Sequence, residues 1–263
     1  MLAGPRRGSS WPVIVETTEG PLFVKLRGAA QGTAALVAEV VVAELADALG
    51  LPVPRRTFVV LGEDLESDDR DGELLDLLAR SRGVNLGFRV LDDPRDLRRE
   101  EAEALPDAFA CAVLWMDALV LNRDRNARNP NVVLSAGRPW LIDHGAALPF
   151  QHDWSAVTED SPRTASYPVE DHLFGGRAAA LAAWDGRLAA KLPREVLGRA
   201  VAAVPDELLR PLVPPGSSDA VIERRRLAYA AFLWKRLRSP RPFLAAPVAR
   251  RSVPDDGRSA PLP

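Results

Sequence analysis

The sequence has very few of the residues that build disulfide frameworks and soft-metal clusters. Its 263 residues include one cysteine and three histidines. The single cysteine, Cys111, excludes an internal disulfide and a cysteine-rich zinc site. Cys111 lies in the apolar run AFACAVLWM, so we interpret it as a small buried hydrophobic residue and not as a nucleophile.

The sequence also lacks a long hydrophobic run and an excess of basic charge. No stretch approaches the ~20 apolar residues of a membrane span, and the N-terminal stretch MLAGPRRGSSWPVIVE has no apolar run of signal-peptide length. The formal net charge is −2 and the pI is about 6.0, which provides no basic field for nucleic acid or an anionic membrane. We therefore expect a cytoplasmic protein without a membrane or nucleic-acid partner.

Apolar residues, in contrast, make up 47% of the chain, which is enough for a sizeable core. Runs rich in β-branched and aromatic residues predict strands in the first hundred residues. Two lie within residues 11–27, joined by a turn at Glu19-Gly20-Pro21, and others cover residues 55–62 and 83–91. Between them, leucines and valines at helical spacing predict a helix over residues 34–50 that ends at Gly50.

From about residue 100 the pattern changes to helices. Residues 106–121 are apolar nearly all round, which predicts a helix buried at the centre of a lobe. Residues 193–204 and 219–237 predict two further helices, whereas residues 146–175 show little periodicity. The chain from Ser239 onward contains six prolines, and we expect it to be disordered.

Strands followed by helices predict an α+β protein with a smaller mixed lobe and a helical lobe. We expect residues 1–95 to form the first lobe and residues 96–238 the second. Residues 239–263 form the proline-rich tail.

The stretch LNRDRNARNPNVVLSAGRPWLIDHG, residues 121–145, gathers polar side chains around a predicted strand hairpin. Asp124 and Asn129 are five residues apart, and Asp143 follows fourteen residues later, at the end of the run WLI. A carboxylate and an amide oxygen suit Mg²⁺, which takes few protein ligands. Asp124 is then free to accept or orient the proton of an attacking hydroxyl. Kinase scaffolds assign the same roles in phosphoryl transfer: one aspartate acts on the acceptor hydroxyl, and an asparagine and a second aspartate bind the metal.

The first hundred residues supply a lysine and a carboxylate for the same chemistry. Lys25 lies in the predicted strand LFVKL, from which it can reach the α- and β-phosphates of a nucleotide. Glu39, fourteen residues later in the predicted helix, can pair with it. Glu44 lies about 140° further round the helix, so both glutamates should not face one cleft. We choose Glu39 because it is nearer the start of the helix.

These segments resemble the HipA-like kinases, a bacterial branch of the protein-kinase-like fold that is also similar to phosphatidylinositol 3- and 4-kinases. DRNARN, residues 124–129, matches the pattern Asp-Arg-His-x-x-Asn except that Asn126 replaces the histidine. IDHG, residues 142–145, stands where such kinases have Ile-Asp-Phe-Gly, with His144 in place of phenylalanine. The run FVKLRGAAQGTAALVAEVVVAELADALGLPVP is similar to their lysine strand and the helix that follows.

The resemblance implies a bilobal protein-kinase-like fold with a small β-rich N-lobe and a mainly helical C-lobe. It implies ATP and Mg²⁺ as ligands, with Lys25 on the phosphates, Asp124 as catalytic base, and Asn129 and Asp143 as metal ligands. By analogy the acceptor is a serine or threonine of a protein. The better-known HipA toxins are longer, so their partner and substrate are not carried over.

Two other functions are compatible with the sequence. The phosphoinositide-kinase-like DRNARN motif is compatible with a kinase of small molecules or lipids. A nucleotide-binding pseudokinase that acts as a regulatory module is compatible with the replaced histidine and with the lack of a G-x-G-x-x-G loop before Lys25. Gly28 and Gly32, after Lys25, bracket the polar stretch AAQ and are our candidates for placing backbone N–H groups near phosphates.

Each of these residues also has a purely structural interpretation. Asp124 and Asn129 are common turn formers in polar loops, and Lys25 could be an edge-strand lysine that extends to solvent. The carboxylate of Glu39 could lie on a solvated helix face.

Four further side chains near the motif have structural interpretations. Arg125 faces either a phosphate or solvent. We interpret His144 as a packing replacement for phenylalanine, and His152 and His172 as surface loop residues.

Overall fold

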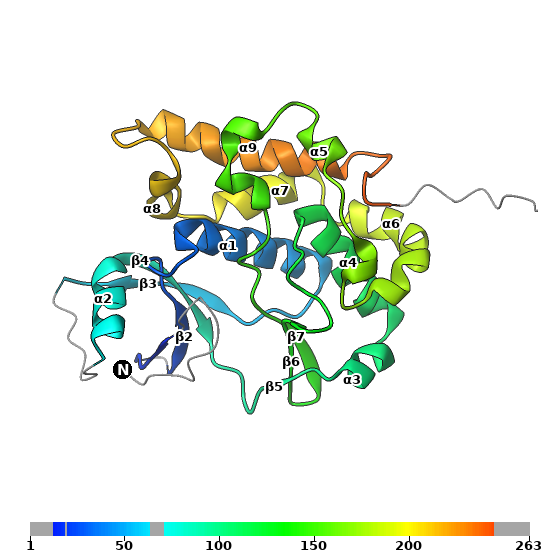
Figure 1. Cartoon of the computed structure of the whole chain (residues 1–263), viewed down its shortest axis with the longest axis horizontal. Coiled ribbons are helices and arrows are strands. Elements are labelled where there is room, and N and C mark those ends of the chain that lie inside the picture. The colour runs from blue at the N-terminus through cyan, green and yellow to red at the C-terminus, as the bar shows by residue number, and fades with distance from the viewer. Residues whose placement is uncertain (1–12, 19, 64–70, 245–263) are drawn as a thin grey trace, which may run out of the picture.

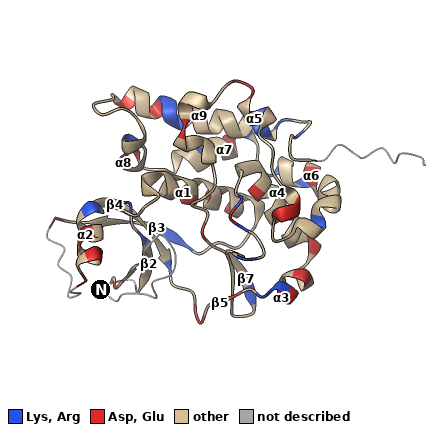
Figure 2. Ribbon diagram, viewed as in Figure 1, with Lys and Arg blue, Asp and Glu red and all other residues tan. Residues whose placement is uncertain are grey.

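The computed structural model describes residues 13–18, 20–63 and 71–244, which form two small antiparallel sheets and a larger set of helices (Figure 1). Outside these ranges lie Gly4 and Gly8, two of the glycines that precede Lys25, the predicted turn residue Glu19, and most of the proline-rich tail. Figure 2 shows basic and acidic residues interspersed along the ribbon, in keeping with the small net charge. None of the described helices has the length and apolar character needed to cross a membrane.

The first sheet contains the four strands predicted from the first hundred residues. Its strand order is β1-β2-β4-β3, and all pairs are antiparallel. The strands are β1 (Val13–Val15), β2 (Leu22–Lys25), β3 (Arg56–Leu61) and β4 (Gly83–Arg89). The short helix α2 (Gly72–Arg80) packs its three buried leucines against apolar residues of this sheet in a small separate cluster. This packing leaves Lys25 at the end of a central strand, paired with Leu86.

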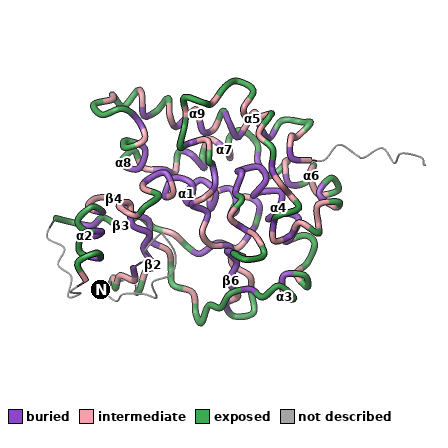
Figure 3. Tube along the Cα trace, in the orientation of Figure 1, coloured by how far each residue is buried: buried purple, intermediate pink, exposed green. Residues whose placement is uncertain are grey.

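Helix α1 (Gly32–Leu49) runs through the interior, and Figure 3 shows most of it as buried. Its valines and leucines share one hydrophobic core with the later helices α4, α7 and α9. The helix ends where the sequence predicts: Gly50 has φ +81°, and its N–H donates to the carbonyl groups of Ala46 and Asp47. A left-handed residue at this position favours glycine.

Helix α4 (Asp107–Val120) and a second sheet position the polar motif. Every α4 residue from Ala110 to Val120 is buried, as the all-round apolar sequence predicts. The predicted hairpin is present as β6 (Val132–Ser135) and β7 (Arg138–Leu141), and a two-residue strand, β5 (Arg95–Asp96), pairs with β6. The hairpin is held to the chain that follows α1, because Leu141 N donates to Pro52 O at 2.8 Å.

The remaining helices cover the core. Helices α7 (Arg194–Ala202) and α9 (Asp219–Leu237) agree with the predictions. The weakly periodic segment after the hairpin forms short turns: η1 (Pro149–His152), η2 (Trp154–Ala156), α5 (Ser161–Thr164), η3 (Val169–Asp171) and η4 (Gly175–Ala180). The prediction missed α3 (Arg99–Ala104), α6 (Leu181–Ala190), α8 (Asp206–Leu209) and η5 (Arg210–Leu212). Few residues of these four elements are buried, so they carry little apolar periodicity.

Candidate functional site

Three charged side chains that are far apart in the sequence meet at the end of strand β2. Lys25 Nζ donates to Glu39 Oε1 of helix α1 and, at 2.7 Å, to Asp143 Oδ1 in the loop after β7. Lys25 and Glu39 are buried, whereas the Asp143 side chain is 40% exposed. The lysine is therefore held from two sides, and of its two carboxylate partners only Asp143 is open to solvent.

Burial and charge act on these three groups in different directions. Burial by itself would lower the pKa of Lys25, but the adjacent carboxylates of Glu39 and Asp143 outweigh it and hold the pKa above its ordinary value. Burial raises the pKa of Glu39 despite the nearby lysine. For Asp143, the attraction to Lys25 outweighs burial and lowers the pKa. Lys25 is therefore a cation and Asp143 an anion at neutral pH.

The choice between the two glutamates of α1 agrees with the observed contacts. Glu39 pairs with Lys25, while Glu44 pairs with Arg56 of β3. The two carboxylates point in different directions because they are five residues apart on one helix.

Replacing Glu39 with glutamine is expected to lower the free energy of unfolding by about 1–3 kcal/mol, because Lys25 stays buried with one carboxylate instead of two. Glu44→Gln is the matched control on the same helix. The Glu44 side chain is 36% exposed, so its loss should change stability by less than about 1 kcal/mol. Urea denaturation of both variants measures the difference, and equal effects would contradict a structural role for the Lys25–Glu39 pair.

The loop that carries Asp143 has an unusual backbone. Asp143 has φ +54°, a region that residues other than glycine seldom adopt and that aspartate tolerates better than most. Gly145 follows closely against α1: a Cβ at this position would lie 3.3 Å from both Ala35 Cβ and Gln31 Oε1. Glycine therefore lets the loop approach the helix that supplies Glu39. Such strain concentrates at functional sites.

The side chain of Asp124 is oriented by two asparagines. Asp124 Oδ2 accepts hydrogen bonds from Asn129 Nδ2 at 3.0 Å and from Asn131 Nδ2 at 3.2 Å. Asn126, which replaces the histidine of the motif, shapes the loop between them: its Oδ1 accepts from the N–H groups of Arg128 and Asn129. A turn-forming role was considered for Asp124 and Asn129. In the structure the side chain of Asn126 forms the turn, while the side chain of Asn129 donates to Asp124.

Asn131 connects the loop of Asp124 to the loop of Asp143. Its side chain donates to Asp124, and its carbonyl oxygen accepts from Ile142 N at 3.0 Å, one residue before Asp143. Its φ of +47° is again left-handed. The sequence analysis missed Asn131. The one available signal was an asparagine directly before a strand, where a left-handed residue can start the turn.

A buried polar network lies beneath Asp124, centred on Asp117 of α4. Asp117 Oδ2 accepts from Arg125 Nε at 2.7 Å and contacts His172 Nε2 at 2.9 Å, and its Oδ1 accepts from Asn122 Nδ2 at 3.1 Å. Both interpretations of Arg125 are wrong, because its side chain is fully buried and faces neither a phosphate nor solvent. His172 is also buried and is not a surface residue. His152, in contrast, is exposed as predicted.

The charges in this network follow from its hydrogen bonds. The N–H of Phe174 donates to His172 Nδ1 at 3.0 Å, so Nε2 carries the proton and donates it to Asp117. Burial lowers the pKa of His172 despite this aspartate. Burial would raise the pKa of Asp117, but Arg125 and the hydrogen bond from His172 hold it well below its usual range. A neutral histidine and an ion pair therefore anchor the loop.

His144 contacts the same network from the other side. It is buried, as expected for a packing replacement of phenylalanine, and its Nδ1 lies 3.2 Å from Arg125 Nη2. An arginine only donates, so Nδ1 accepts, and Nε2 has no partner among the described residues. Burial and the positive charge of Arg125 lower the pKa of His144 to about 3, so it stays neutral.

The N–H groups of the two glycines that bracket the predicted phosphate-binding stretch donate within the chain. Gly28 N donates to Ser81 Oγ at 3.1 Å, and Gly32 N donates to Ala29 O at 2.8 Å. That the two glycines place N–H groups of the intervening stretch near phosphates stays a prediction, but their own N–H groups have partners within the chain. Glycine is needed at position 28 because the loop between β2 and α1 packs closely against the end of α2. A Cβ at this position would lie 2.7 Å from Ser81 Oγ.

Oxygen ligands of the type that Mg²⁺ prefers are available at two of the predicted positions. Within the described ranges, no three histidine, cysteine, aspartate or glutamate side chains come together as a metal cluster. The partly exposed Asp143 carboxylate and the exposed Asn129 amide nevertheless offer a charged and a neutral oxygen. These suit an ion that completes its shell with water and phosphate oxygens, so the residues fit Mg²⁺ in donor type.

A comparison with models of protein families identifies the family of the chain. Residues 3–163, more than half of the chain, match a family model described as HipA-like kinase. The matched segment includes Lys25, Glu39, Asp124 and Asp143 and ends before His172. No curated protein matches the chain significantly.

Proposed function

The chain belongs to the HipA-like kinase family, and from this premise we propose that it transfers the γ-phosphoryl group of ATP to a hydroxyl acceptor. The observation that carries the proposal is the convergence of Lys25, Glu39 and Asp143 from a strand, a helix and a loop. A lysine held by a helix glutamate beside a metal-binding aspartate is the arrangement that protein kinases use on the phosphates of ATP.

Lys25 would hold the α- and β-phosphates. It is cationic and nearly buried, and its two carboxylate partners fix the position of the ammonium group. When ATP binds, its phosphates would compete with Asp143 for Lys25, which would free the aspartate for the metal. Asp143 and Asn129 would hold Mg²⁺, and the bound ion would neutralise negative charge on the phosphates.

Asp124 would accept the proton of the attacking hydroxyl. Its Oδ2 is occupied by Asn129 and Asn131, which fix the carboxylate and leave Oδ1 for the acceptor. The transition state of phosphoryl transfer is loose, so positioning and charge neutralisation supply most of the catalysis. Asn131 and the Asp117 network would serve as positioning residues in this scheme.

The proposed fold is the bilobal kinase arrangement, with residues 1–95 as the N-lobe and residues 96–238 as the C-lobe. The separate apolar cluster between α2 and the first sheet supports a distinct N-lobe. Helix α1 would belong to both lobes, because it carries Glu39 and also shares the large core with α4, α7 and α9.

The proposed acceptor is a serine or threonine of a protein, by analogy with the family. A second candidate function is that of a nucleotide-binding pseudokinase. It is favoured by the glycine N–H groups that donate within the chain and are not free for phosphates.

Incubation of the purified chain with Mg²⁺ and ATP labelled at the γ-phosphate tests these functions. Label on protein supports the proposal, whereas label only on a small-molecule pool supports a small-molecule kinase. Tight Mg-ATP binding without any transfer would identify a pseudokinase. Absence of both binding and transfer would reject a nucleotide site at Lys25.

Replacing Asp143 with asparagine is expected to weaken Mg²⁺-dependent binding of a non-hydrolysable ATP analogue by about 10- to 100-fold, because the metal loses its charged ligand. Calorimetry with Mg²⁺ and with EDTA measures the difference. Asp96→Asn, at an exposed aspartate of β5, is the control and should bind like the unmodified protein. Equal affinities for all three proteins in Mg²⁺ would show that Asp143 is not a metal ligand.

A further inference from the structure

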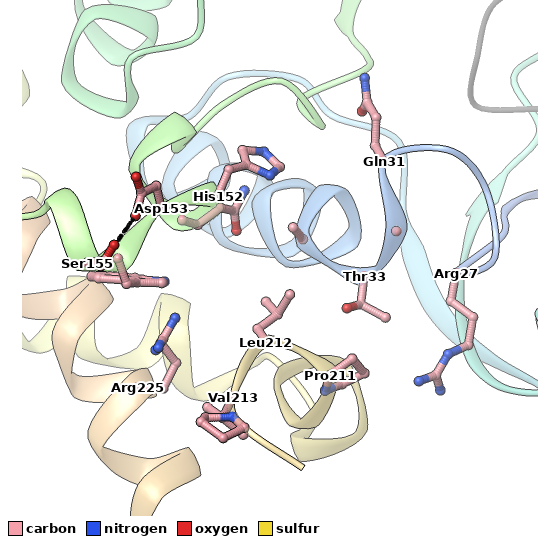
Figure 4. A pocket seen from close by; sticks show the side chains of 15 residues that line it. Arg27, Gln31, Thr33, His152, Asp153, Ser155, Pro211, Leu212, Val213 and Arg225 are labelled. Atoms are coloured by element: carbon pink, nitrogen blue, oxygen red, sulfur yellow. Dashed lines mark hydrogen bonds between the residues drawn. The ribbon is translucent and has the colours of Figure 1, made fainter.

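A second cavity, of about 810 Å³, lies beside the N-terminus of helix α1. Figure 4 shows that its walls come from the loop before α1, the start of α1, the turns η1 and η2, η5 with the two residues after it, and helix α9. Lys25, Asp124, Asn129 and Asp143 do not line it. The cavity is therefore separate from the proposed nucleotide site, although both border on Gln31 and Gly32.

The start of α1 presents hydrogen-bond donors to this cavity. Thr33 is only 6% exposed and lines the wall, and Figure 4 shows its side chain on the cavity side of the helix. In the described part of the chain, its hydroxyl has no hydrogen-bond partner, and neither do the N–H groups of Thr33 and Ala34. Gln31 does not cap the helix with its side chain. These donors are therefore available to a ligand that accepts hydrogen bonds at the helix N-terminus.

Two arginines on the cavity wall lack carboxylate partners. Arg225 of α9 makes no ion pair with any described residue, and its guanidinium lies over the ring of Trp154, 4.6 Å from the centroid. Arg27 donates to the carbonyl oxygen of Glu207 at 3.3 Å and likewise forms no salt bridge within the described ranges. The next arginine on α9, Arg226, pairs with both Asp206 and Glu223. Neighbouring arginines of α9 thus differ, because two acids balance the charge of Arg226 and no described acid pairs with Arg225.

The one acidic side chain on the wall is already engaged. Asp153 Oδ1 accepts from the N–H groups of Ser155 and Ala156 and from Ser155 Oγ, and Figure 4 marks the last of these contacts. The wall also carries the two arginines and the Thr33 hydroxyl, and the helix N-terminus adds its partial positive charge. The cavity therefore favours a ligand with several acceptor oxygens and a negative charge.

We propose that this cavity binds a phosphomonoester. The phosphate would accept from the Thr33 hydroxyl and the free N–H groups of α1, with Arg225 and Arg27 balancing its charge. The volume exceeds that of a phosphate group, and Trp154, Pro211 and Leu212 line it as apolar surface. An organic group attached to the phosphate would pack there.

Calorimetric titration of the full chain tests the site without any measurement of kinase activity. The probes are O-phosphoserine and a blocked peptide that contains one phosphoserine, with the unphosphorylated peptide as reference. Binding of either phosphorylated probe at millimolar concentration or below is expected. Stronger binding of the free amino acid would identify a small phosphorylated molecule as the ligand, and stronger binding of the peptide a phosphorylated protein segment.

Two variants and a matched control locate the binding. Arg225→Gln should weaken it at least about 10-fold, since a charge-assisted contact is lost, and Thr33→Val, which keeps the side-chain shape, about 3- to 10-fold. Arg224→Gln, at the exposed neighbouring arginine outside the cavity, should stay within about twofold. The proposal is overturned if neither phosphorylated probe binds, if the Arg224 variant weakens binding as much as the Arg225 variant, or if a Mg²⁺-bound ATP analogue displaces the probe stoichiometrically.

Discussion

Replacement of Asp124 with asparagine is expected to reduce phosphoryl transfer by about 10²- to 10⁴-fold, while the affinity for a Mg²⁺-bound ATP analogue changes by less than about twofold. An asparagine keeps the size of the side chain, and its oxygen can still accept from one of the two neighbouring asparagines. It has no carboxylate to take the proton of the acceptor. The chemical step is therefore affected and nucleotide binding is not.

Single-turnover transfer and calorimetric binding, both measured on the same preparation, separate these effects. Asp76→Asn on α2 is the control, because Asp76 is exposed and lies outside the site. Unchanged transfer by the Asp124 variant would show that another group accepts the proton. A loss of nucleotide affinity as large as the loss of transfer would indicate that Asp124 binds the metal.

Replacement of Asp117 with asparagine is expected to lower the free energy of unfolding by about 3–5 kcal/mol. Arg125 and Asp117 are both fully buried, so loss of the carboxylate leaves a guanidinium in the core without its counter-charge. His172 also loses the anion that accepts its Nε2 proton. A loss of this size is a large part of the total stability of a typical domain.

Asp107→Asn at the start of the same helix provides the control. The Asp107 side chain is 63% exposed and pairs with Arg177, so its loss should cost less than about 1 kcal/mol. Denaturant unfolding of the two variants measures the contrast. A cost below about 1 kcal/mol for the Asp117 variant would mean that water or a rearranged Arg125 replaces the carboxylate.

The Asp117 variant should also impair the site at a distance. Arg125 donates to the carbonyl oxygens of Asn131 and Ile142, and its own carbonyl accepts from Leu173 N at 3.1 Å. Loss of the ion pair would loosen the loops of Asp124 and Asp143 together with the segment that carries His172. We therefore expect weaker transfer from this variant even at temperatures where it remains folded.

Local sequence patterns were sufficient to predict most of the elements that carry the site. Runs rich in β-branched and aromatic residues predicted β2 and β4, and the runs VVL and WLI predicted the hairpin. Helical spacing predicted α1, and an all-round apolar run predicted α4. For the partner of Lys25, the helical repeat predicted only that Glu39 and Glu44 do not both face the cleft, and the position of Glu39 nearer the start of the helix selected it. These features depend on residues close together in the chain.

The sequence by itself therefore determined the strands, the main helices and the spacing of the motif residues, while only the tertiary structure decided the partners of the buried polar groups. Arg125 and His172 look like loop residues in sequence. They are buried because α4 brings Asp117 against segments 8 and 55 residues away. The cavity beside Thr33 is likewise lined by residues of both α1 and α9, which are almost two hundred residues apart in the sequence. Such contacts depend on how whole helices pack, and the hydrophobic periodicity of a single segment does not specify that packing.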